Sequence, residues 1–183
     1  MSAHPTPSDV WSSMLAGNRR FVAGEPEHPR QDAERRHELA HVQRPTAALF
    51  GCSDSRLAAE IIFDEGLGDL FVIRNAGQVI SDSVVGSLEY AVAVLGVPLI
   101  VVLGHDECGA VRAAIDSTAP DAPALPAGIW RQVAPIVPAV RRVLQASPGT
   151  TSATVDAEEV GREHLRDTIA GILHSSELIS DAV

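Results

Sequence analysis

Three short apolar runs, separated by helical patterns, constrain the fold of this chain more than any other feature. The runs span residues 46–51 (TAALFG), 70–73 (LFVI) and 98–103 (PLIVVL). The clearest helical pattern between them covers residues 83–95. Strands that are continuously apolar are buried on both faces, which is typical of a parallel sheet covered by helices. The sequence therefore predicts an α/β fold with a mainly parallel sheet flanked by helices.

Further helical patterns precede and follow these runs. A helix is expected after Pro7, and a charged helix is expected over about residues 31–42. Pro135 and Pro138 predict a kinked or short helix, because proline removes a backbone donor. Residues 156–180 carry apolar positions at helical spacing and predict one amphipathic helix.

Length and charge limit the function classes. With 183 residues, 45% hydrophobic content and no visible linker or repeat, we expect a single domain over residues 1–183, with residues 1–45 as a helical arm. The net charge is −10 and the 14 basic residues, all arginine, form no run longer than a pair, so no nucleic-acid partner is expected. No run is long enough to predict a membrane span, and no signal peptide is recognised. We expect a cytoplasmic protein.

Both cysteines follow predicted strands. Cys52 comes directly after residues 46–51, and His105 and Cys108 come after residues 98–103. The carboxyl ends of neighbouring parallel strands meet at one edge of the sheet, which is the usual ligand crevice. Two thiolates and one imidazole suit zinc, and three protein ligands leave a fourth position open for chemistry. The alternative is two buried structural cysteines and an ordinary hydrogen-bonded histidine.

A carboxylate and a guanidinium accompany the first cysteine in Cys52-Ser53-Asp54-Ser55-Arg56. In extended chain, alternate side chains point the same way, so Asp54 and Arg56 share a side with Cys52. This arrangement favours a catalytic role beside the metal over a plain surface ion pair, which is the alternative.

This pair of motifs resembles the β-class carbonic anhydrases. The resemblance rests on Cys52-Ser53-Asp54-Ser55-Arg56 with His105-x-x-Cys108-Gly109, and residues 71–77 and 89–92 fit as well. It covers most of the chain. It implies reversible hydration of carbon dioxide to bicarbonate and a proton by zinc-bound hydroxide, with one zinc ion per chain.

The resemblance also implies residue roles. Cys52, His105 and Cys108 match zinc ligands, and Asp54 and Arg56 match the catalytic dyad. Asp54 would become a fourth zinc ligand in a closed state that low pH favours. The positions that match substrate-binding residues are Gln43, Phe71, Ala76, Tyr90 and Gly109.

Assembly is a further implication of the resemblance. It predicts an obligate homodimer, possibly a tetramer, whose partner subunit supplies part of the apolar pocket and receives the arm of residues 1–45. An additional strand, which usually follows the last helix at the sheet edge, is absent from the sequence. Arg74 matches the arginine of a noncatalytic bicarbonate pocket, but Leu49 replaces its tryptophan and no matching tyrosine is found. Bicarbonate regulation is therefore not expected.

Three other interpretations of the function remain open. His37, Glu38 and His41 satisfy the H-E-x-x-H pattern of zinc proteases, but charged neighbours place them on a solvated face. The same fold and zinc site could hydrolyse carbon disulfide or carbonyl sulfide. A non-catalytic zinc-binding protein is the third alternative, and the Asp54–Arg56 pair argues against it.

Overall fold

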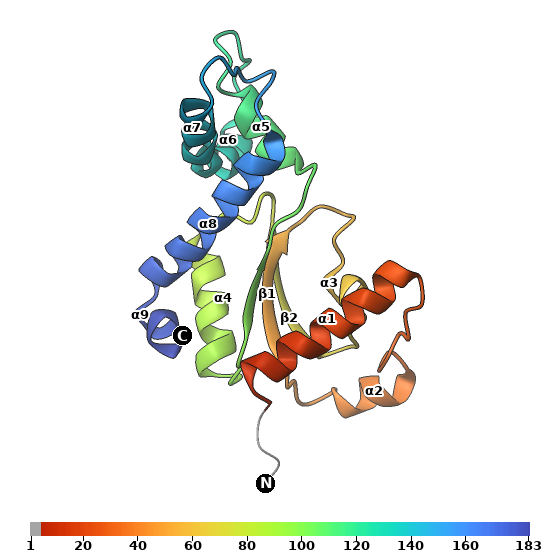
Figure 1. Ribbon diagram of the computed structural model, residues 1–183. Helices are drawn as coiled ribbons and strands as arrows, with labels where there is room; N and C mark the ends of the chain where they lie inside the picture. Colours follow the sequence, from red (N-terminus) through yellow and green to blue (C-terminus); the bar gives the residue numbers. More distant parts are fainter. Residues whose placement is uncertain (1–4) are drawn as a thin grey trace.

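The computed structural model describes residues 5–183 and confirms the α/β fold. Within these residues, three strands form a parallel sheet in the order β2-β1-β3 (Figure 1). They are β1 (Ala47–Cys52), β2 (Leu70–Asn75) and β3 (Ile100–Leu103). The strands match the three apolar runs to within two residues at each end. β1 lies in the middle of the sheet, and all six of its residues are buried.

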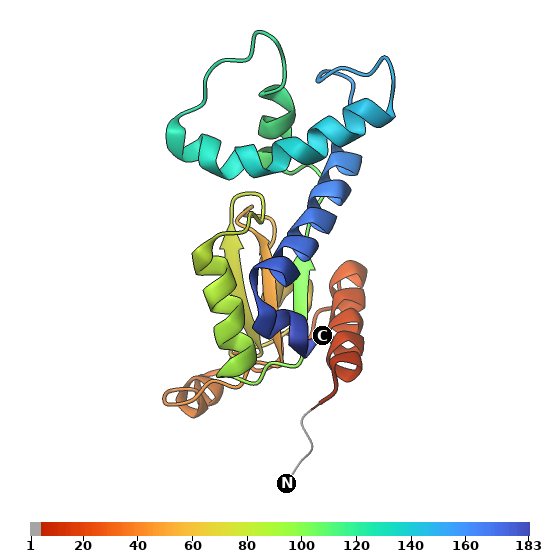
Figure 2. The same ribbon diagram turned by 90° about the vertical axis from the view of Figure 1, so that its left-hand side faces the viewer.

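Helices cover both faces of the sheet (Figure 2). Alternate residues of β1 point to opposite faces: Ala47 and Leu49 pack toward α1 (Pro7–Ala23) and α3 (Ala59–Ile62). Ala48 and Phe50 pack toward α4 (Asp82–Ala93), α8 (Ala157–Ser175) and α9 (Glu177–Ala182). The two-residue period of the strand therefore sends apolar side chains into two separate cores.

A third core lies beyond the carboxyl ends of the strands, between α5 (Gly109–Asp116), α6 (Ala127–Val133), α7 (Val137–Ala146) and the start of α8 (Figure 1). A 3₁₀ turn, Ala134–Ile136, separates α6 from α7. Pro135 lies in this turn and Pro138 in the first turn of α7, as the sequence predicts for a kinked helix.

Two predicted helices differ from the structure. The charged helix is only α2 (Ala33–Glu38), and no residue in it is buried, so tertiary packing does not extend it to residue 42. The last amphipathic pattern is divided between α8 and α9 at Ser176, whose backbone is extended. The Ser176 hydroxyl accepts a hydrogen bond from the backbone N–H of Ile179 and caps the new helix.

The N-terminal segment docks onto its own chain through a buried carboxylate. Asp64 has a left-handed backbone (φ 49°) and accepts hydrogen bonds from the backbone N–H groups of Glu27 and His28. Arg20 donates to the same carboxylate at 2.6 Å. The Glu27 N–H, followed by Arg20 and the His28 N–H, lowers the Asp64 pKa to about 2, although burial opposes this shift. Packing of residues 1–45 on a partner subunit stays a prediction.

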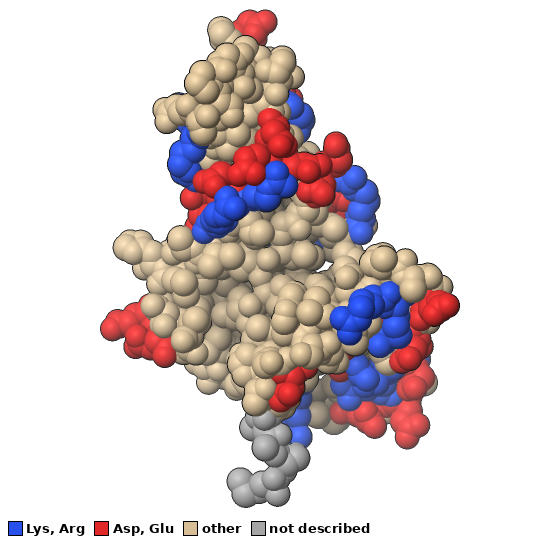
Figure 3. Space-filling view, viewed as in Figure 1, with Lys and Arg blue, Asp and Glu red and all other residues tan. Residues whose placement is uncertain are grey.

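Charged side chains gather in a belt over α8, above a broad face with few charges (Figure 3). No helix within residues 5–183 combines the length and the apolar character needed to cross a membrane.

Gly17 provides a test of the packing between α1 and α3. A Cβ atom at this position would lie 1.8 Å from the carbonyl oxygen of Phe63, which is backbone and cannot rotate away. We expect Gly17→Ala to lower the free energy of unfolding by about 1–3 kcal/mol, as overpacked substitutions do. Thermal and urea unfolding measure this change.

The matched control is Gly161→Ala in α8, where a Cβ atom would have no neighbour within 4 Å. We expect this variant to gain about 0.5–1 kcal/mol, because alanine favours the helix. Equal effects of the two substitutions would contradict the close α1–α3 contact.

Candidate metal centre

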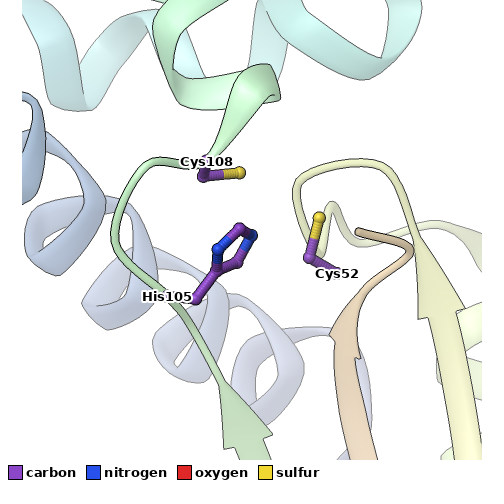
Figure 4. A group of neighbouring side chains, drawn as sticks. All are labelled: Cys52, His105 and Cys108. Carbon is purple, nitrogen blue, oxygen red and sulfur yellow. The ribbon is translucent and has the colours of Figure 1, made fainter. Parts of the chain in front are cut away.

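Cys52, His105 and Cys108 converge at the carboxyl ends of the strands (Figure 4). One ligand atom from each residue lies within 4.8 Å of the others. Cys52 is the last residue of β1, whereas His105 and Cys108 lie in the loop between β3 and α5. The imidazole ring points between the two sulfur atoms (Figure 4). The structure therefore brings together the metal ligands that the sequence predicts.

The parallel register explains this convergence. Gly51 pairs with Leu103, so the chain leaves β1 and β3 at the same level of the sheet. The β3–α5 loop then turns back through Glu107, whose backbone is left-handed (φ 54°). This turn lets Cys108 serve as the N-cap residue of α5. A non-glycine residue in this conformation is uncommon and indicates a constrained loop.

The hydrogen bonds of the three side chains fit a zinc site. Nδ1 of His105 lies 2.7 Å from the carbonyl oxygen of Asp106, which can only accept, so Nδ1 carries the proton. The other nitrogen, Nε2, is buried and has no hydrogen-bond partner, which leaves its lone pair available. Cys52 and Cys108 are 5% and 6% exposed and form no disulfide. This donor set matches a site with three protein ligands.

Electrostatics disfavour a charged Cys108 without a cation. Burial raises the pKa of the Cys108 thiol, and the charge of Cys52 raises it further. The backbone N–H groups of Val111 and Ala110, in the first turn of α5, oppose this rise. Two buried sulfur atoms this close together would therefore need a bound cation to be stable as thiolates.

Asp54 and Arg56 form a bidentate ion pair beside the metal ligands. Arg56 Nε donates to Asp54 Oδ1 and Nη2 to Oδ2, both at 2.8 Å, and the backbone N–H of Arg56 also donates to Oδ1. The side-chain and backbone hydrogen bonds from Arg56 hold the Asp54 pKa well below its usual range. Asp54 is therefore paired with arginine in this structure, and the closed state remains a prediction.

Two arginines connect the loops that carry these groups. Arg56 Nη2 also donates to the Glu107 carbonyl at 3.0 Å, which joins the Asp54 loop to the β3–α5 loop. Arg74 donates to the carbonyl oxygens of Cys52 (2.9 Å) and Asp54 (2.6 Å). Arg74 thus holds the backbone of the loop that begins at Cys52. Leu49, which replaces the tryptophan of the noncatalytic bicarbonate pocket, is buried in the core.

The predicted substrate-binding residues divide into two groups. Ala76 follows β2 directly and Gly109 follows Cys108, so both lie at the end of the sheet that carries the metal ligands. Phe71 pairs with Ala48, four positions before Cys52, which places it roughly 13 Å along the strand at 3.3 Å per residue. The Tyr90 ring lies 6.2 Å from that of Phe71. Gln43 is exposed and precedes β1, at the other end of the strand from Cys52. Phe71, Tyr90 and Gln43 therefore form a second group that is remote from the chain's own metal ligands.

The protease-like pattern does not form a site. His37 lies in α2, but the helix ends at Glu38 and His41 follows a turn. The two histidines are therefore not on one helical face. Within residues 5–183, the Cys52, His105 and Cys108 group is the one cluster of three or more ligand side chains.

His164 lies in α8 and carries no motif that marks it in the sequence, but its position in the fold is informative. It is 3% exposed, and its Nε2 lies 2.7 Å from the Gly77 carbonyl oxygen. Gly77 in turn donates its N–H to Cys52 Sγ at 3.3 Å. The four-residue spacing from Val160 to His164 and Thr168 was a signal that this histidine faces the interior.

Metal analysis tests this centre directly. We expect one zinc ion per chain in the protein and a large loss of zinc in Cys108→Ser, because a neutral hydroxyl is a poor replacement for a thiolate. Elemental analysis of the purified proteins measures the change. The control is the double variant His37→Ala/His41→Ala, which should keep its zinc; loss of zinc from this variant would contradict the assignment.

The comparisons with known proteins agree with this geometry. The carbonic anhydrase family model matches residues 47–183. Carbonic anhydrase 2 of Mycobacterium tuberculosis is 48% identical over 178 residues, which is 97% of this chain and 82% of that protein. A carbonic anhydrase of Mycolicibacterium smegmatis is 47% identical over the same shares of the two chains.

Solved structures are similar over nearly the whole chain. The β-carbonic anhydrase CafA of Aspergillus fumigatus superposes with a TM-score of 0.68 and 26% identity, covering 95% of this chain and 80% of its own. A tetrameric β-carbonic anhydrase of Sordaria macrospora has a TM-score of 0.67 and 25% identity, with 94% and 84% covered. With its sequence relatives, its fold and its Cys-His-Cys cluster in agreement, the chain belongs to the β-class carbonic anhydrase family.

Proposed function

We propose that this protein is a zinc enzyme that catalyses the reversible hydration of carbon dioxide to bicarbonate and a proton. The observation that carries the proposal is the Cys52, His105 and Cys108 cluster beside the Asp54–Arg56 pair. A structural zinc site is closed by four protein ligands, whereas this cluster offers three. A non-catalytic zinc site would also have no use for the Asp54–Arg56 pair.

Each side chain of the cluster has a defined task. Cys52, His105 and Cys108 would hold zinc through two sulfur atoms and the unpartnered Nε2. Bound zinc supplies Lewis acidity, which lowers the pKa of water and provides a nucleophilic oxygen near neutral pH. The Asp106 carbonyl keeps the His105 ring in one tautomer and one orientation.

Asp54 is suited to orient the nucleophile. Its low pKa keeps it ionised, so it can accept hydrogen bonds but cannot donate them. Oδ1 already accepts two hydrogen bonds from Arg56, whereas Oδ2 accepts one. Oδ2 can therefore accept a further hydrogen bond from an oxygen that carries a proton, and Arg56 holds the carboxylate in position for this contact.

The substrate requires little more than an apolar surface and a donor. Carbon dioxide is uncharged, so burial in an apolar pocket suits it better than an ion pair would. Ala76 and the backbone N–H of Gly109 lie at the metal end of the sheet and would contribute from the same chain.

The remaining pocket residues support a homodimer. Phe71 and Tyr90 form an aromatic pair at a distance from the chain's own cluster, and Tyr90 is 45% exposed. Gln43 is exposed as well. If these residues contact substrate, they do so in the site of a partner subunit. This arrangement makes the dimer the smallest complete catalytic unit, and association of dimers into a tetramer would be additional.

Stopped-flow carbon dioxide hydration, with zinc measured on the same samples, tests the reaction. We expect activity that increases with pH in the zinc-loaded protein. Asp54→Asn should lower kcat/KM by about 100-fold or more, the effect of removing one preorganised hydrogen-bond partner at the reacting atoms, while zinc content stays unchanged.

The matched control is Asp116→Asn, which breaks an exposed ion pair with Arg112 on α5 and should leave the rate unchanged. Zinc-loaded protein that hydrates no carbon dioxide at any pH would contradict the proposal. Carbon disulfide and carbonyl sulfide would then be the next substrates to assay.

Mixed dimers test the contribution of the partner subunit. Cys108→Ser lacks a metal ligand and should lose its activity together with its zinc, whereas Gln43→Ala lacks the substrate-side amide and should lose about 100-fold in rate, as when one stabilising donor is removed. Coexpressed, the two chains should regain activity, because the Gln43→Ala chain keeps its cluster and receives Gln43 from its partner. Activity no higher than the sum of the separate variants would show that each site belongs to one chain.

A further inference from the structure

A left-handed turn presents a backbone donor to the metal cluster. Gly77 and Gln78, which follow β2, both have positive φ values, 80° and 40°. The N–H of Gly77 points to Cys52 Sγ, with nitrogen and sulfur 3.3 Å apart. A Cβ atom at Gly77 would lie 2.8 Å from the Ala110 side chain, so glycine is required here. Glycine is conformationally free, and the direction of its N–H therefore depends on groups outside the turn.

Side chains on both sides of the turn hold it. Asn75 closes it from within, since its amide donates to the Val79 carbonyl (2.6 Å) and accepts from the Val79 N–H (2.8 Å). His164, from α8, donates through Nε2 to the Gly77 carbonyl at 2.7 Å. The carbonyl and the N–H of the same glycine are thus bound by His164 and by Cys52.

His164 is suited to this role because it stays neutral. Burial lowers its pKa, so the ring carries one proton, and the Gly77 carbonyl requires that proton on Nε2. The other ring nitrogen, Nδ1, is buried without a partner. The hydrogen bond from Nε2 to the Gly77 carbonyl is therefore the one polar contact that this buried ring makes within residues 5–183.

The next residue of α8, Leu165, lies beside the β3–α5 loop that carries His105 and Cys108. A Cβ atom at Gly104, the residue before His105, would lie 3.6 Å from a methyl group of Leu165 and 3.6 Å from the Gln78 amide nitrogen. His164 therefore holds the turn after β2 whose N–H donates to Cys52, and Leu165 lies beside the loop that carries His105. The path of α8 from the upper core toward the sheet makes this contact possible (Figure 1).

We propose that His164 is a positioning residue of the metal centre, which fixes Gly77 so that its N–H donates to the Cys52 thiolate. This inference rests on the proposed zinc site. A hydrogen bond to a ligand sulfur orients the ligand and withdraws charge from it, and such outer groups influence metal affinity. His164 does not touch the substrate and is not a catalytic residue.

Zinc transfer to a chromogenic chelator measures the effect on affinity. His164→Leu and His164→Ala remove the donor and should weaken zinc binding by about 10- to 100-fold, the range found for groups that hold metal ligands. His164→Gln places an amide N–H near the position of Nε2 and should recover most of the affinity. Far-UV circular dichroism of the metal-free variants verifies that they are folded.

The cobalt-substituted proteins give a second readout. Weakening the hydrogen bond from the Gly77 N–H to the Cys52 sulfur raises the energy of the sulfur lone pairs. The sulfur-to-cobalt charge-transfer band should therefore move to longer wavelength in His164→Leu and His164→Ala. A residue that merely filled space in the core would alter thermal stability without shifting this band.

Thr168→Val is the matched control. Thr168 is equally buried, lies one turn along α8, and donates to the His164 carbonyl (2.9 Å) and to the Gln78 carbonyl (3.4 Å). Its replacement therefore perturbs the same helix and the same turn but leaves the hydrogen bond from the His164 ring to Gly77 in place. It should keep the zinc affinity and the cobalt band of the parent protein.

The possible failures are distinguishable. Wild-type protein that binds no zinc would overturn the metal site and the role of His164 together. Wild-type protein that binds one zinc ion, with unchanged affinity and an unchanged band in His164→Leu and His164→Ala, would overturn the role of His164 alone.

Discussion

The parallel pairing of β1 with both neighbouring strands is the constraint on which the metal centre depends. Cys52 ends β1, and the register places it level with Asn75 and next to the start of the β3–α5 loop. Antiparallel pairing at either edge would send one of these loops to the opposite end of the sheet. The sheet in turn requires helices that cover both of its faces. Successive residues of β1 present apolar side chains to each face, against which these helices pack. Burial of the strands thus determines where the polar chemistry can occur.

The groups around the cluster are arranged as supports rather than as additional ligands. Arg74 holds two carbonyls of the Cys52 loop, and Arg56 connects Asp54 to the Glu107 carbonyl. His164 and Gly77 approach from the other side. For Asp54 to leave its arginine and reach the metal, the bidentate pair must break. The predicted closed state would therefore exchange this ion pair for a contact with the metal, and the structure contains Asp54 paired with Arg56.

The sequence was sufficient for the fold class and for the residues that form the cluster. Apolar runs and their periodicity report burial directly, and Cys52, His105 and Cys108 lie where those runs end. Helix ends were predicted less well, because Ser176 can cap a new helix as easily as it can continue an old one. The contact between His164 and Gly77 could not be predicted from the sequence. The partner of His164 is a backbone carbonyl 87 positions away, and every residue has such a carbonyl whatever its side chain.

The remote group of Gln43, Phe71 and Tyr90 shows a different limit. A motif match assigns a residue to a site, but it does not state which copy of the chain owns that site. The strand register shows only that Phe71, near the start of β2, is remote from the metal end of its own sheet. An uncharged substrate needs an apolar pocket, and the two cysteines are buried in the core beyond the strand ends. Association of two chains can complete such a pocket without either chain having to enclose it alone.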